Sequence, residues 1–234
     1  KILERLPVSL QLSLISIFLS YLISVPIGVY SATHQFSLSD KVITFALFIL
    51  YSLPSFWVAS LLIMLLGGGD FWDLFPVFGL SSEGAERWPF WLWLWDRAMH
   101  LVLPITCLTY GGLASLSRYS RVGMLEVVRQ DYIRTARAKG LSERMVIYKH
   151  ALRNSVIPIV TFLGLLLPAM LGGSVIIETI FSIPGMGNLG FEAVLSRDYP
   201  VIMGIATISS LLTLVGLLIS DVLYVVVDPR ISFE

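Results

Sequence analysis

The sequence predicts an all-α membrane protein, a polytopic bundle of spanning helices. Hydrophobic residues make up 56% of the 234 residues, charged residues only 14%, and the mean hydropathy is +0.82. Soluble domains carry roughly 25% charged residues, so this composition excludes an ordinary soluble fold. A net charge of zero also argues against a nucleic-acid binder that relies on a basic surface.

Five apolar stretches are long enough for a helix of about 20 residues to cross a bilayer. The expected spans are approximately Ser9–Tyr30, Val42–Leu66, His100–Leu116, Ser155–Ile177 and Val201–Val227. Prolines lie inside four of them, at Pro26, Pro54, Pro104, Pro158 and Pro168. We expect kinks at these prolines, which a membrane bundle tolerates because neighbouring helices can satisfy the freed carbonyls.

The only long polar segment runs from Arg118 to Arg153 and holds more than half of all the lysine and arginine. Apolar residues recur in it every three or four positions, which is helical periodicity. They form two series: Met124, Val128, Tyr132 and Ala136, then Leu141, Met145, Tyr148 and Leu152. Gly140 lies between the series, where a helix C-cap or bend is easiest without a Cβ, and Ser142 is an N-cap candidate. The pattern predicts two amphipathic helices broken at Gly140.

Loop charges predict the orientation in the membrane, since cytoplasmic loops carry the excess of lysine and arginine. Arg118–Arg153 should therefore face the cytoplasm, and the acidic loop Gly67–Met99 and the segment Glu178–Pro200 should face outward. Five spans with this polarity put Lys1 outside. We expect residues 1–234 to form a single transmembrane domain, with a further span upstream of it.

Catalytic and metal-binding motifs are missing from the sequence. Cys107 is the only cysteine, which excludes a disulfide or a multi-cysteine metal site. His34, His100 and His150 lie at loops or helix ends, and no HExxH, GxSxG or phosphate-binding GxxxxGK[ST] motif occurs. We expect no catalytic residue, no metal and no cofactor, so the chain should not be an enzyme.

Residues Thr135–Pro158, TARAKGLSERMVIYKHALRNSVIP, resemble the EAA loop of ABC-importer permeases in its dipeptide, oligopeptide and nickel importer version. Only Ala136, Gly140 and Leu152 survive from the general motif, whereas the match to the peptide-importer version is close. The resemblance implies that this segment, the coupling elbow Arg118–Arg153, contacts an ATPase. The implied ATPase-coupling residues are Arg134, Thr135, Ala136, Arg137, Ala138, Lys139, Gly140, Leu141 and Ser142.

Further stretches resemble the same family in the same order. Ile176–Ile202 is similar to its external segment between the last two helices, and Asp221–Ile231 to its C-terminal signature. The external-segment residues of interest are Glu178, Pro184, Gly185 and Gly187, and we expect a turn there and a structured segment at the outer end of the pathway. Asp221 is either structural or lines that pathway.

The outer loop is rich in aromatic residues. They are Phe71, Trp72, Phe75, Phe78, Trp88, Phe90, Trp91, Trp93 and Trp95. Tryptophan belongs at the membrane interface, so we interpret them first as an aromatic belt, with a docking surface as the alternative.

The resemblance covers nearly the whole chain and implies a type I (MetI-like) permease subunit in the cytoplasmic (inner) membrane. It would pair with a second similar permease, two cytoplasmic ATP-binding subunits and an external substrate-binding protein, and import peptides, nickel chelates or related small solutes by alternating access. The rivals are an ion-gradient-driven secondary transporter, an intramembrane enzyme and a non-transporting membrane scaffold. A secondary transporter should show ionisable relays in several spans and inverted repeats, and neither is visible.

Overall fold

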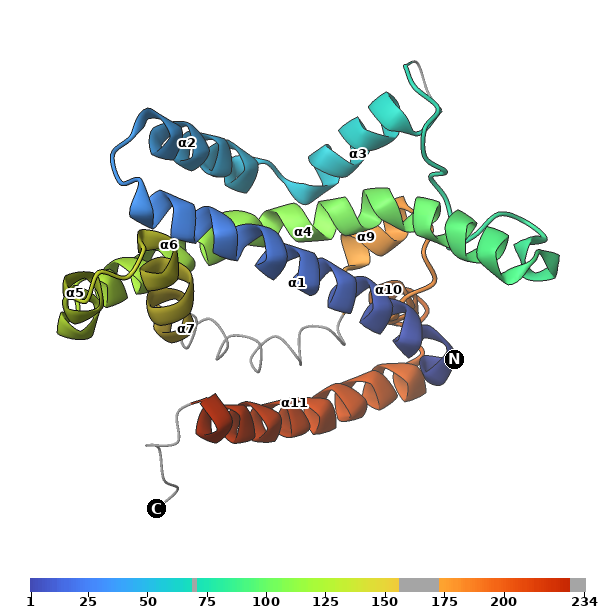
Figure 1. Ribbon diagram of the computed structural model, residues 1–234. Helices are drawn as coiled ribbons and strands as arrows, with labels where there is room; N and C mark the ends of the chain where they lie inside the picture. Colours follow the sequence, from blue (N-terminus) through green and yellow to red (C-terminus); the bar gives the residue numbers. More distant parts are fainter. Residues whose placement is uncertain (69–70, 156–172, 228–234) are drawn as a thin grey trace. The chain divides into compact units, whose positions relative to one another are not determined.

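The computed structural model describes residues 1–68, 71–155 and 173–227. Their regular structure is helical, and the only strand-like pairing among them is an isolated bridge between Gly67 and Asp73. The expected all-α class is therefore confirmed for the described part of the chain (Figure 1).

Three of the described helices are long and apolar enough to cross a membrane: α1 (Ile2–Thr33), α4 (Phe90–Val128) and α11 (Tyr199–Val227). They contain the first, third and fifth expected spans. Pro104 lies inside α4 without interrupting it. The fourth expected span, Ser155–Ile177, lies mostly outside the described residues.

The second expected span is not one helix. The prediction of a kink at Pro54 within a continuous helix is therefore wrong, because the helix is interrupted there. The span consists of α2 (Leu38–Ser52) and α3 (Ser55–Leu66), and the two are bent at the break between them. Pro54 has no N–H, and its backbone is extended at φ −64° and ψ 139°. The helical donor to the Leu53 carbonyl would be the Trp57 N–H, which donates to the Pro54 carbonyl instead. The Leu53 carbonyl accepts a hydrogen bond of 2.9 Å from the Tyr110 hydroxyl. A neighbouring helix therefore satisfies the freed carbonyl, as expected for a broken membrane helix.

The chain forms two compact units. The first comprises residues 1–18, 52–111 and 168–213, and the second comprises residues 19–51, 112–167 and 214–234. The first includes η1 (Ala85–Arg87), α9 (Val175–Ile180) and α10 (Met186–Leu195). The second includes the short helices of the coupling elbow.

Small residues bring α1 and α4 close together in the second unit. The Ser120 hydroxyl donates to the Val25 carbonyl at 3.2 Å, and the Ser24 hydroxyl donates to the Leu113 carbonyl, also at 3.2 Å. A Cβ on Gly28 would lie only 2.6 Å from the Ser117 carbonyl oxygen. Close backbone approach through small residues and interhelical hydrogen bonds is typical of membrane helix pairs.

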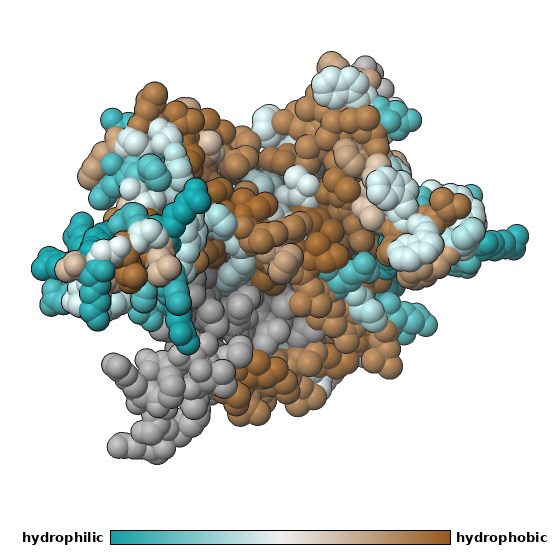
Figure 2. All heavy atoms as spheres, in the orientation of Figure 1, coloured by the Kyte–Doolittle hydropathy of each residue, from teal (hydrophilic) through white to brown (hydrophobic). Residues whose placement is uncertain are grey.

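Helix α11 carries a hydrophobic surface, shown in brown in Figure 2. Large apolar side chains on it are exposed, among them Met203, Leu214 and Leu218 at 63–68%. Apolar side chains exposed all along a long helix are expected where the solvent is lipid.

Candidate functional site

The coupling elbow folds as a chain of short helices after the long α4. It contains α5 (Asp131–Ala138), α6 (Glu143–Met145), the π-helical η2 (Val146–Ala151) and α7 (Leu152–Ser155). The expected break at Gly140 is confirmed. The prediction of a single helix before it is wrong, because α4 ends at Val128 and a second break at Arg129 and Gln130 precedes α5.

Gly140 ends α5 in a left-handed conformation, with φ +75°. Its N–H donates to the Arg137 carbonyl at 2.9 Å, and the Leu141 N–H donates to the Ala136 carbonyl at 3.4 Å. This pair of bonds is the Schellman C-cap, which favours glycine at the residue after the cap. A Cβ on Gly140 would meet no atom within 4 Å in this chain. The constraint on Gly140 within the chain is therefore its backbone conformation and not a steric clash.

Ser142 occupies the N-cap position of α6, with an extended backbone at φ −62° and ψ 145°. Its carbonyl accepts the Val146 N–H at 3.0 Å. The expected position is correct, but the Ser142 side chain makes no capping hydrogen bond.

An ion pair that the sequence analysis missed closes the bend at Gly140. Arg137 donates from Nε and Nη2 to the two carboxylate oxygens of Glu143, at 3.1 Å and 2.6 Å. This hydrogen bonding raises the pKa of Arg137 and lowers the pKa of Glu143. Their side chains are 40% and 56% exposed, so the pair contributes little to stability but has the planar, bidentate geometry that fixes orientation. The available signal was a pair of opposite charges on either side of a predicted bend.

A buried core holds the elbow against the ends of α1 and α4. It consists of Val29, Met124, Ile133, Ala136, Val146 and Ala151, packed with half-buried neighbours such as Leu141 and Leu152. All of the expected coupling residues except Ala136 and Leu141 are exposed. Figure 2 shows this region of short helices as predominantly hydrophilic.

The elbow also exposes an apolar surface made of Tyr132, Met145 and Tyr148, which are 43%, 43% and 65% exposed. These residues belong to the two predicted apolar series, whose members Met124 and Ala136 are buried. Ile133 and Val146, their neighbours in sequence, are buried instead. The elbow therefore has two apolar faces, one covered by the chain and one uncovered.

The external segment is organised around Glu178, which is 1% exposed. Its Oε1 accepts hydrogen bonds from the Ser9 hydroxyl at 2.9 Å and the Ser174 N–H at 3.2 Å. Its Oε2 accepts the Asn188 N–H at 2.8 Å. Ser9 in turn accepts the Met186 N–H at 2.7 Å, so its single proton is available for Glu178. One carboxylate thus connects α1, α9 and α10 within the first unit.

Glycines make room for this carboxylate. A Cβ on Gly185 would lie 2.5 Å from both Glu178 carboxylate oxygens, and one on Gly187 would lie 3.0 Å from Oε2. The expected turn is confirmed, because α9 ends at Ile180 and α10 begins at Met186. Pro184 lies in that turn, half-buried. The structure therefore brings Glu178, Gly185 and Gly187 together and places Pro184 beside them.

The outer loop is attached to the external segment. The Gly79 N–H donates to the Phe181 carbonyl at 2.9 Å, and Phe181 itself is fully buried. The expectation that the last of the aromatics lie in this loop is wrong for Trp91 and Trp95, which lie on the first turns of α4 and are 76% and 67% exposed. The side chain of Asp221 lies outside the described residues, as does most of the C-terminal signature. Among the residues described, no group of three or more His, Cys, Asp or Glu side chains could hold a metal ion.

Comparison with known proteins identifies the family. Residues 24–233 match the family of binding-protein-dependent transport system inner membrane components. The chain belongs to this family. It is 46% identical over 232 residues to the oligopeptide transport system permease protein AppB of Bacillus subtilis, covering 99% of this chain and 71% of that protein. It is 39% identical over 234 residues to the peptidoglycan transport system permease protein YejB of Agrobacterium fabrum, covering 100% and 64% respectively.

Two further similarities support the assignment. The chain is 37% identical over 247 residues to the dipeptide transport system permease protein DppB of Escherichia coli K12, covering 98% of this chain and 72% of that protein. An inward-facing structure of the MetNI methionine ABC transporter matches the fold with a TM-score of 0.71, at 16% identity, over 96% of this chain and 95% of that chain. The predicted family, MetI-like fold and inner-membrane location are confirmed. As predicted, a member of this family is a transport component and not an enzyme.

Proposed function

We propose that this chain is the membrane-spanning permease subunit of an ATP-driven importer that moves peptides or related small solutes inward by alternating access. Peptide substrates are supported by the relatives, whose names refer to oligopeptides, dipeptides and peptidoglycan. Those names give no support to nickel chelates, which the sequence resemblance left open.

The transport system would contain a second similar permease, two cytoplasmic ATP-binding subunits and an external substrate-binding protein. The family description supports dependence on a binding protein. The sequence has no phosphate-binding loop, so energy from ATP would reach this chain through a partner. The coupling elbow would face the cytoplasm, because loops rich in lysine and arginine remain on that side.

The observation that carries the proposal is the uncovered apolar surface of the elbow, Tyr132, Met145 and Tyr148. These side chains are exposed on short helices whose opposite face is packed into a core. The elbow is therefore a preformed surface and not a solvated linker. Tyrosine, methionine and arginine are enriched in protein interfaces, and aromatic anchors carry much of the binding energy. We assign this surface to contact with an ATP-binding subunit.

Substitution of Tyr148 tests this assignment. Tyr148→Ala should weaken retention of the ATP-binding subunit and lower substrate uptake, because loss of an anchoring aromatic typically costs about 2 kcal/mol or more, roughly 30-fold in affinity. The measurement is copurification of the ATP-binding subunit and peptide uptake at matched membrane abundance.

Phe36→Ala is the matched control, since Phe36 is 74% exposed in the same unit but lies in the α1–α2 connection. It should retain both partner and uptake. Wild-type behaviour of Tyr148→Ala, or equal impairment of the two variants, would contradict the coupling assignment.

The external segment would lie at the outer end of the translocation pathway. Glu178, with Pro184, Gly185 and Gly187, would keep its turn rigid during the transport cycle. Support comes from the number of backbone donors that converge on one buried carboxylate.

A further inference from the structure

The second unit contains a cavity of about 590 Å³, lined by residues of α1, α2 and α4. Much of its lining is apolar, contributed by Leu47, Phe48, Val122 and Leu125. Polar side chains line the same space, among them Ser117, Arg118 and Arg121. The cavity thus offers an apolar surface and basic groups to a single ligand.

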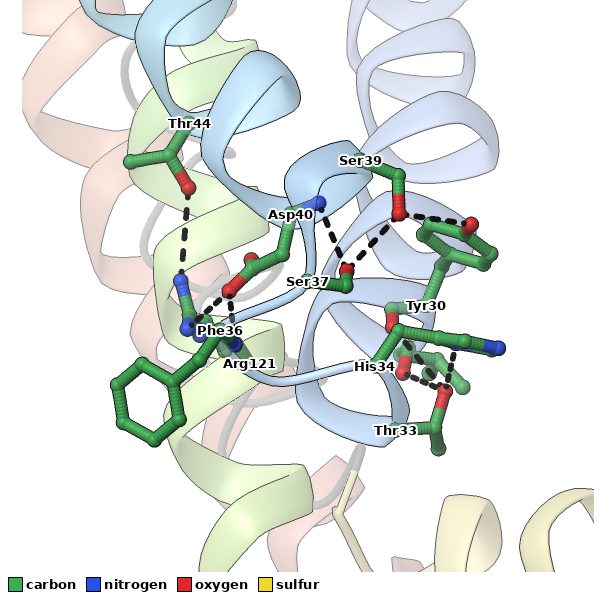
Figure 3. A network of polar contacts seen from close by, with 10 residues as sticks. Tyr30, Thr33, His34, Phe36, Ser37, Ser39, Asp40, Thr44 and Arg121 are labelled. Atoms are coloured by element: carbon green, nitrogen blue, oxygen red, sulfur yellow. Dashed lines mark hydrogen bonds and ion pairs between the residues drawn. The ribbon is translucent and has the colours of Figure 1, made fainter.

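Arg121 is held in place by α2 (Figure 3). Its Nη2 donates to Asp40 Oδ2 at 2.8 Å, and its Nη1 donates to the Thr44 hydroxyl at 3.5 Å. Asp40 is 3% exposed and also accepts the Phe36 N–H at 3.0 Å. The charge of Arg121 is therefore largely neutralised by a buried carboxylate, and its guanidinium forms a rigid part of the wall.

Arg118 and Ser117 have no partner among the described residues, and Oδ1 of the buried Asp40 carboxylate, whose Oδ2 pairs with Arg121, also lacks one. Arg118 lies one turn before Arg121 on α4 and is exposed. It forms no ion pair or hydrogen bond with the residues that the structure describes. Ser117 is 3% exposed, and its buried hydroxyl also lacks a hydrogen-bond partner among the described residues. A buried hydroxyl without a partner is unusual in a folded protein. A free guanidinium and a free hydroxyl on one cavity are complementary to an anion with several acceptor oxygens.

We propose that this cavity binds an anionic phospholipid. The phosphate would lie between the Arg118 guanidinium and the Ser117 hydroxyl, because arginine recognises phosphate through charge-assisted hydrogen bonds. An acyl chain would follow Leu47, Phe48, Val122 and Leu125. Basic pockets between membrane helices are suited to anionic lipid head groups on the cytoplasmic side, and Arg118 begins the basic segment of this chain.

A phospholipid fits these features better than a free phosphate or a partner helix. A free phosphate would leave the apolar lining unused. An apolar helix would leave the Arg118 charge and the Ser117 hydroxyl unsatisfied. The site also differs from the coupling surface, so its failure would leave the proposed ATPase contact intact.

Native mass spectrometry of the full-length permease, purified with its partner subunits, tests the site. After exchange into equal amounts of phosphatidylglycerol and phosphatidylcholine, the complex should retain phosphatidylglycerol preferentially. Arg118→Gln should lower that retention about fivefold, the contribution of one basic residue near an anionic surface. Ser117→Ala should lower it as well, while phosphatidylcholine binding stays unchanged.

Three controls decide the occupant. Arg129→Gln removes an exposed charge from the same segment but outside the cavity lining, so it should leave phosphatidylglycerol retention unchanged. Ala114→Trp, which fills the cavity, should release the lipid and leave the complex assembled. Inorganic phosphate added to the delipidated complex should give no lasting adduct.

Several results would overturn the proposal. Equal retention of the two lipids, or equal losses in Arg118→Gln and Arg129→Gln, would mean that binding is not specific to the cavity. A lasting phosphate adduct would assign the site to a free anion. Loss of the partner permease in Ala114→Trp with normal lipid retention would identify the cavity as a seat for a protein helix.

Discussion

Glu178 organises the external segment because both of its carboxylate oxygens accept hydrogen bonds from the surrounding donors. In Glu178→Gln one oxygen becomes an amide nitrogen, which cannot accept a hydrogen bond. Oε1 accepts hydrogen bonds from Ser9 and Ser174, and Oε2 accepts one from Asn188. In either orientation of the glutamine amide, its NH₂ group would therefore point at a hydrogen-bond donor. We expect a loss of about 1–3 kcal/mol in stability, measured as a lower melting temperature of the purified complex.

Glu192→Gln is the control for this substitution. Glu192 is an exposed carboxylate on α10, so its replacement should leave the melting temperature unchanged. A melting temperature of Glu178→Gln equal to that of the wild type would show that the buried hydrogen bonds do not hold the segment together.

Gly140 should be required for coupling and not for membrane insertion. Its left-handed backbone costs roughly 1–2 kcal/mol for a residue with a Cβ, and a β-branched residue tolerates it poorly. Gly140→Val should insert normally and should lose ATPase attachment or uncouple ATP hydrolysis from uptake. The measurement is copurification of the ATP-binding subunit together with peptide uptake.

Ser142→Ala is the matched change beside it, because the Ser142 side chain makes no capping hydrogen bond. It should be nearly silent in both assays. Normal coupling in Gly140→Val would make the bend an ordinary loop.

Among the elements, the break between α2 and α3 depends on Tyr110. Tyr110→Phe removes the hydroxyl that donates to the Leu53 carbonyl and leaves a half-buried acceptor without this donor. We expect a loss of about 1–3 kcal/mol, visible as faster hydrogen exchange around Pro54. Tyr199→Phe is the control, because it removes a hydroxyl from a residue that is 66% exposed. Amide hydrogens around Pro54 should exchange in this variant at the wild-type rate. Equal exchange rates in the wild type and both variants would contradict the role of Tyr110.

The elements show where sequence reasoning succeeds and where it stops. Hydrophobic length located α1, α4 and α11, and the glycine between two periodic series located the bend at Gly140. Periodicity could not decide which apolar face of the elbow is buried, because Tyr132 and Ile133 are both apolar neighbours and only tertiary packing separates them. The helix break before α5 has no strong sequence signal at Arg129 or Gln130.

At the candidate sites, the residues involved were easier to predict than the residues with which they form hydrogen bonds or ion pairs. A proline and two glycines indicated the turn, and the family resemblance indicated a structured segment. The hydrogen bond from Ser9 to Glu178 that holds it joins residues 169 positions apart. The Arg137–Glu143 pair and the Asp40–Arg121 pair likewise depend on how the chain folds back on itself. Such contacts follow from the fold and cannot be read from local spacing.

At the scale of the whole molecule, the central claim is that the coupling elbow transmits the work of an ATP-binding subunit to the membrane helices. Each of the two compact units contains part of α1, of α4 and of α11. A movement of the elbow would therefore act on helices that belong to both units. The ATP-binding subunit would contact the elbow at the exposed side chains of Tyr132, Met145 and Tyr148.

Photo-crosslinking in native membranes tests this claim most directly. A photoreactive amino acid would replace Tyr148, with Phe36 as the control position, and the adducts would be identified by mass spectrometry. The account predicts an adduct between position 148 and the ATP-binding subunit, with a yield that differs between resting and ATP-trapped states, and none from position 36. An adduct pattern at position 148 that lacks the ATP-binding subunit in both states would contradict it.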